Sequence, residues 1–99
     1  MNSSANSAFE PLAQSVRLND DNLIVELTDG REISVPISWY PRLDHGTKKE
    51  RENFEVMGPG HGIHWPDLDE DISVAGLLTG KPSNESSESL SRWLSERGV

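Results

Sequence analysis

The chain of 99 residues contains no cysteine, and this absence excludes several kinds of chemistry at once. Without thiols the chain can form no disulfide, bind no metal through thiolates and use no cysteine nucleophile. A cysteine-free sequence also fits a reducing compartment, so we expect a cytoplasmic protein.

Long apolar runs are missing as well. No stretch of the sequence approaches the roughly 20 apolar residues that a membrane-spanning helix needs. Residues 1–9 contain neither a basic cluster nor an apolar core, which a secretory signal would require. We therefore expect no association with a membrane.

Basic residues are scarce, with 9 Lys and Arg against 17 Asp and Glu, for a formal net charge of −8. Binding of nucleic-acid phosphates needs a basic face, and this chain is repelled from phosphates overall. Lys48, Lys49 and Arg51 sit among Glu50 and Glu52 and so make no such face. Direct nucleic-acid binding is not expected. The acidity favours a basic protein partner, although solubility alone would also explain it.

The composition is otherwise that of one small globular domain, 33% hydrophobic and 26% charged. Residues 1–12 are polar and aperiodic and are predicted to form a disordered arm. Residues 13–80 carry nearly all the periodic apolar positions and are predicted to form a compact domain. Residues 81–88 are rich in serine, as linkers are, and residues 89–99 are predicted to form a short amphipathic tail helix.

A β-hairpin is the clearest structural signal. Two segments alternate apolar and polar residues, with the apolar side chains at Leu23, Val25 and Leu27 and then at Ile33, Val35 and Ile37. A two-residue loop would place polar residues opposite apolar ones. A three-residue loop, residues 28–30, places Val25 opposite Ile33 and Leu23 opposite Val35. It also puts Gly30 where the backbone turns left-handed, which only glycine adopts at little cost.

The remaining elements are expected to be short. Residues 14–18 add a strand before the hairpin, Ser38 is expected to cap a helical turn, and Thr47 with Glu50 matches a capping box for a helix over 48–53. Strands are expected at 54–58 and 63–65. The acidic residues from 67 to 71 are expected to precede a helix that begins near Asp69 or Asp71, where free amides favour negative charge.

These elements together predict an α+β fold: a small, mostly antiparallel sheet with an N-terminal meander or hairpin, one or two short helices and a C-terminal tail helix.

Residue types that serve in catalysis or metal binding are clustered in one segment of the sequence only. Imidazoles and carboxylates can hold zinc or manganese, and the candidates for a metal site are His61, His64, Asp67, Asp69 and Asp71. Their spacing matches neither the zinc-protease helix nor the calcium-binding loop. An acidic loop that caps the following turn explains the same residues. We identify no catalytic residue and no cofactor, and expect the protein not to be an enzyme.

Aromatic residues supply a second set of candidates. Leu90, Trp93 and Leu94 are spaced to form one apolar stripe on a helix of two turns, which is marginal alone in water and must dock on something. Trp93 suits the chain's own core and a partner equally well. We expect Trp39 and Trp65 to pack in the core. Trp39 and Tyr40 are kept with the stripe as candidate partner-binding residues.

Two strings of the sequence resemble a known bacterial family. They are VPISWYPRL at residues 35–43 and GHGIHWPDLDEDIS at residues 60–73, and with the hairpin they are similar to the family of domain of unknown function 2442 over roughly residues 16–80. The resemblance implies a compact α+β fold without established activity. It also implies a two-gene, toxin–antitoxin-like module in which this family is the presumed antitoxin. It implies no catalytic residues.

Three functions remain in competition at this point. The first is a non-enzymatic protein-binding domain, the antitoxin-like member of such a module, whose partner is a small basic protein encoded nearby. The second is a metal-binding or metal-dependent enzyme that uses His61, His64 and the adjacent aspartates. The third is a structural accessory domain that self-associates through Trp39 or Trp93. The sequence leaves the partner, the oligomeric state and the packing of the tail helix open.

Overall fold

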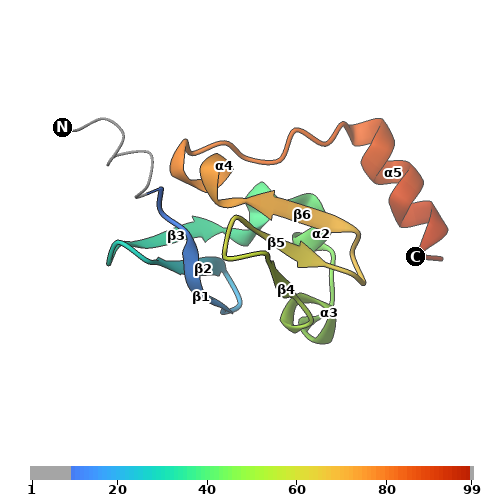
Figure 1. The fold of residues 1–99 in the computed structure, drawn as a ribbon. Coiled ribbons are helices and arrows are strands. Elements are labelled where there is room, and N and C mark those ends of the chain that lie inside the picture. Colours follow the sequence, from blue (N-terminus) through green and yellow to red (C-terminus); the bar gives the residue numbers. More distant parts are fainter. Residues whose placement is uncertain (1–9, 99) are drawn as a thin grey trace.

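The computed structural model describes residues 10–98 and confirms the α+β class. Its strands form two antiparallel three-stranded meanders joined by short helices, and a separate helix follows (Figure 1). The first sheet contains β1 (Ala13–Leu18), β2 (Asn22–Leu27) and β3 (Glu32–Pro36). The second contains β4 (Glu55–Met57), β5 (Gly62–Trp65) and β6 (Glu70–Ser73). Of the predicted disordered arm, residues 1–9 lie outside the described part.

The predicted hairpin and its register are confirmed. Val25 pairs with Ile33 and Leu23 pairs with Val35 across β2 and β3. Gly30 closes the three-residue loop with φ +94 and donates its N–H to the Leu27 carbonyl at 3.0 Å. The apolar faces and the glycine position together selected this loop, as the sequence pattern indicated.

Short helices connect the two sheets: η1 (Ile37–Trp39), α2 (Pro41–Asp44) and α3 (Lys48–Glu52). The capping box of α3 is confirmed, because Glu50 N–H donates to Thr47 Oγ1 at 3.1 Å and Thr47 N–H donates to Glu50 Oε1 at 2.9 Å. The predicted cap at Ser38 is wrong, since Ser38 lies inside η1. Pro41 starts α2 instead. Its fixed φ and missing N–H suit a first helical position without a side-chain cap.

The helix predicted to begin near Asp69 or Asp71 is also wrong. Asp69 lies in the turn before β6 and Asp71 lies within β6. Helix α4 (Val74–Leu78) begins only after Ser73, whose Oγ accepts the Gly76 N–H at 2.9 Å. Ile72 pairs with Ile63 and is 5% exposed. Burying such a side chain is worth about 1.5–3 kcal/mol, whereas a favourable charge at a helix start is worth about 0.3–1 kcal/mol. Packing therefore decided this segment.

Both sheets contribute to one hydrophobic core. Leu23 and Val25 from the first sheet and Ile63 and Trp65 from the second have no exposed surface. The Trp65 indole N–H donates to the Arg51 carbonyl at 2.9 Å, which satisfies its polar atom within the core. Trp39 is partly buried against the same cluster. Trp65 thus packs in the core as predicted, and Trp39 packs at the core's margin.

Helix α5 (Ser87–Glu96) is the last helix of the described chain. It begins at Ser87 rather than at the predicted residue 89, because Ser86 caps it by accepting the Ser89 N–H at 3.0 Å. Residues 81–86 before it form neither helix nor strand. Among the helices described, none is long and apolar enough to cross a membrane.

Gly60, in the β4–β5 turn, lies against Ala13 of the first sheet. Its carbonyl accepts the Ala13 N–H at 2.8 Å and so ties the β4–β5 turn to the first strand. Its φ is +123, and a Cβ at this position would lie 2.6 Å from the Ala13 carbonyl oxygen. Both the backbone conformation and the space therefore require glycine here.

We expect Gly60→Ala to destabilise the fold by roughly 3 kcal/mol, because it combines backbone strain with overpacking against β1. Gly58→Ala is the matched control: Gly58 also has positive φ, but its added Cβ meets nothing within 4 Å. That control should cost only about 1 kcal/mol. Urea unfolding curves of the two variants measure the difference, and equal midpoints would contradict the assigned role of Gly60.

Candidate partner-binding surfaces

The tail helix docks on its own domain through Trp93. This side chain is 8% exposed and lies between two guanidinium groups, with Arg42 Cζ at 5.0 Å and Arg97 Cζ at 4.6 Å from the ring centroid. Arginine over the face of an indole is attracted by the ring's negative quadrupole. The arrangement joins residues from α2 and from the end of α5, so the tail is held by side chains rather than by a sheet or a helix bundle.

Two ion pairs fix this docked position. Arg42 bonds Glu85 in the linker at 2.7 Å, and Arg97 bonds Glu50 in α3 at 2.8 Å. The Arg42 guanidinium holds the pKa of Glu85 below its ordinary value. Hydrogen bonds from Arg97, and then from the Thr47 backbone, lower the pKa of Glu50 to about 2. All four side chains are less than a quarter exposed, which makes these pairs stronger than surface pairs.

The candidate partner-binding residues mostly face the chain's own core. Leu90 and Leu94 are partly buried against the hydrophobic cluster, and Trp39 is partly buried in the same way. Tyr40 is 5% exposed, its hydroxyl donates to the Lys81 carbonyl at 3.4 Å, and burial raises its pKa. In the docked state these side chains stabilise the domain rather than offer an accessible surface.

The candidate metal ligands separate into different environments. His64 Nδ1 and Asp71 Oδ1 lie 2.6 Å apart on adjacent strands. Asp67 accepts a hydrogen bond from Asn53 at 2.9 Å, Asp69 lies 3.6 Å from Arg42, and His61 is exposed in the β4–β5 turn. Over residues 10–98, no three side chains of the types that hold metals converge on one point.

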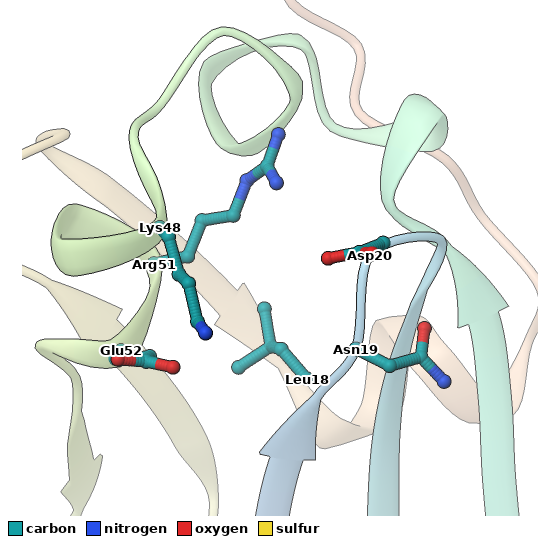
Figure 2. A pocket seen from close by; sticks show the side chains of 6 residues that line it. All are labelled: Leu18, Asn19, Asp20, Lys48, Arg51 and Glu52. Atoms are coloured by element: carbon teal, nitrogen blue, oxygen red, sulfur yellow. The ribbon is translucent and has the colours of Figure 1, made fainter.

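A polar hollow of about 250 Å³ opens between the β1–β2 turn and α3. Figure 2 shows Lys48 and Asp20 reaching into it from opposite walls, with Leu18 between them. Arg51 turns away from the centre, because its guanidinium donates to the carbonyls of Leu43 and Asp44 at the end of α2. The side chains that line the hollow carry charges of both signs. Arg51 caps the C-terminus of α2 and so has a structural role.

A second surface was not anticipated from the sequence. Val56 and Met57 are 42% and 45% exposed, and both lie on β4, which is an edge strand of the second sheet. Glu55 precedes them, and all three residues of β4 are exposed. An apolar pair beside a charge in a three-residue strand is too short a pattern to separate a surface from a core segment. Only the strand order places it at an edge.

Acid should loosen the tail. Because the pKa of Glu50 is lowered from 4.5 to about 2, its pair with Arg97 stabilises the docked tail fully above about pH 5 and is lost as the pH falls toward 2. The pKa of Glu85 is lowered as well, so its pair with Arg42 is also lost in acid. NMR of the Trp93 indole N–H checks this: its signal should move toward that of a free indole between pH 5 and 2. Arg97→Gln lacks the pair with Glu50, so in this variant the Trp93 indole signal should already lie partway toward that of a free indole at pH 7. If the unchanged chain and Arg97→Gln gave the same pH titration of this signal, the Glu50–Arg97 pair would not be what holds the tail.

Comparisons with known proteins agree with this fold. A protein of unknown function from Rhodospirillum rubrum is 29% identical, with a TM-score of 0.68, covering 77% of this chain and 94% of its own. An uncharacterized protein from Chromobacterium violaceum is 21% identical, with a TM-score of 0.64, covering 91% and 82%. Among curated proteins, none matches. The family described as protein of unknown function (DUF2442) matches residues 13–83, which excludes α5. The chain therefore belongs to the DUF2442 family.

Proposed function

We propose that this protein is a non-enzymatic protein-binding domain whose partner is a small basic protein, and that the two form an antitoxin-like and toxin-like pair. The observation that carries the proposal is how the chain distributes its charges. An acid excess that is left uncompensated on the surface attracts and orients a basic partner.

The arginines are engaged within the chain. Arg17, Arg31, Arg42, Arg92 and Arg97 each form an ion pair with a carboxylate, and Arg51 binds backbone carbonyls. Much of the positive charge therefore neutralises particular acids locally. Over the described residues, many other acids have no cation within ion-pair distance, among them Asp20, Asp21, Glu52, Glu55 and Glu96. These exposed carboxylates produce the outward field.

The docked tail supports a partner surface on the body of the domain rather than on α5. Trp93 would have to leave the Arg42 guanidinium, and Arg97 would have to leave Glu50, before the tail could reach a partner. The family match ends at residue 83, so the family's shared domain excludes this helix. We therefore assign α5 to stabilising the body and assign partner binding to residues within the family domain.

Co-purification tests the proposal. The tagged full chain, expressed with its neighbouring gene from the native operon, is expected to recover that gene's product in a stoichiometric complex, and the product is expected to be basic. Because the attraction is between charges, raising salt from 50 to 500 mM should weaken the complex at least about tenfold. Recovery of no stoichiometric partner, or of a partner whose binding ignores salt, would contradict the proposal.

A further inference from the structure

We propose that the basic partner binds as an extended segment along the free edge of β4, with alternate apolar and cationic side chains over the outer face of the second sheet. This inference rests on the proposed function and names its surface. It follows from three independent features of that sheet: an open backbone edge, an exposed methionine beside a hollow, and a row of carboxylates.

The backbone edge is open. In the described sheet β4 is hydrogen-bonded to β5 alone, and its three residues are all exposed. The Met57 carbonyl points into the hairpin, where it accepts the N–H groups of Gly60 and His61. Because peptide groups alternate in direction along an antiparallel strand, the N–H and C=O of Val56 point to the free side. A segment added there would find backbone partners, as in strand-addition complexes.

The apolar surface lies at the same place. Among residues 10–98 the large hydrophobic side chains classed as exposed are Val56 and Met57. Met57 pairs with Gly62, which carries no side chain on the outer face, and a mostly apolar hollow of about 250 Å³ opens beside them. The rest of its lining consists of His61, Asp71, Ile72 and Ser73. An apolar side chain of an added segment could therefore pack against Met57 at the mouth of this hollow.

The charges of the sheet specify a cationic segment. Glu55 pairs with His64, and His64 pairs with Asp71, so two carboxylates flank one imidazole in a row across the outer face. The three strands contain no lysine or arginine. Glu55 lies two residues before Met57 and on the same face. A segment whose apolar side chain meets Met57 therefore presents its next residue on that face to Glu55, where Lys or Arg is favoured.

The same charges disfavour a second copy of this chain as the occupant. Antiparallel pairing of two β4 strands about Val56 would bring both Glu55 carboxylates into one short interface. Each chain also carries a formal net charge of −8, so the two copies repel each other before contact. A partner rich in Lys and Arg meets neither obstacle.

The experiment uses the full chain with methyl-labelled methionine, because the sequence has only Met1 and Met57 and each gives one signal. The probe is a synthetic eight-residue peptide that repeats Val-Ser-Lys-Ser, so that Val and Lys alternate on one face of a strand, and its counterpart has Glu in place of each Lys. We expect the Lys peptide to shift the Met57 signal and leave the Met1 signal in place, and the Glu peptide to shift neither. A Lys peptide that leaves Met57 unmoved overturns the surface.

Charge reversal supplies the matched variants. Glu55→Lys should weaken binding of the Lys peptide at least fivefold, whereas Glu88→Lys, the same change on α5 at an 86% exposed side chain, should weaken it less than twofold. If both variants lost the same amount of affinity for the Lys peptide, the peptide would be attracted by net charge alone, and the proposed site would be overturned. Unchanged thermal midpoints confirm that both variants fold. Light scattering tests the alternative occupant: if the free chain were a dimer that Glu55→Lys dissociates, the edge would bind a second copy of this chain instead.

The same pair of variants separates failure of the surface from failure of the proposed function. If the native basic partner binds Glu55→Lys as tightly as the unchanged chain, the β4 surface is wrong while the protein-binding function stands. If the unchanged chain recovers no basic partner, the function itself is wrong, whatever the peptide does. If Glu55→Lys no longer binds the native partner while Glu88→Lys still does, the β4 surface and the protein-binding function are both supported.

Discussion

The burial of Trp65 is the constraint on which the rest of the molecule depends. A three-stranded meander of short strands has too little apolar surface to be stable alone, so the two sheets must share one core. Trp65 lies in that shared core without exposed surface, and its indole N–H donates to the Arg51 carbonyl. Arg51 in turn caps α2 through its guanidinium. One side chain therefore couples the second sheet to the connecting helices, and Gly60 completes the junction by approaching Ala13.

The functional surfaces follow from this arrangement. Once the inner faces of both sheets are buried, the outer face of the second sheet and its edge β4 are left to solvent. The tail covers a different region, where Trp93 lies between Arg42 and Arg97. The chain thus uses its scarce cations to hold its own parts together. The carboxylates left without cations set the outward charge, which is the physical basis for a basic partner.

Much of the first half of the fold could be predicted from local pattern. Alternation at Val25 and Ile33, together with the position of Gly30, was enough to fix the hairpin register, because a slip by one residue would expose the entire apolar face. The capping box at Thr47 was visible for the same reason: it depends on residues three apart. In the acidic segment before Ile72 the local charges favour a helix start, but pairing with the neighbouring strand β5 buries Ile72 and is worth more.

The sequence by itself determined the family, the α+β class, the acidic character, the hairpin register and the apolar stripe of the tail, since each depends on composition or on neighbours a few residues apart. Only the tertiary structure decided that Asp71 meets His64 while Asp67 and Asp69 turn elsewhere, that Trp93 docks between two arginines, and that β4 is an open edge. Some of these outcomes depend on which neighbouring strands pair, as for His64 and Asp71, and others on contacts between segments far apart in the chain, as for Arg42 and Trp93. Such pairing is selected by the total burial of the core, which no local pattern encodes.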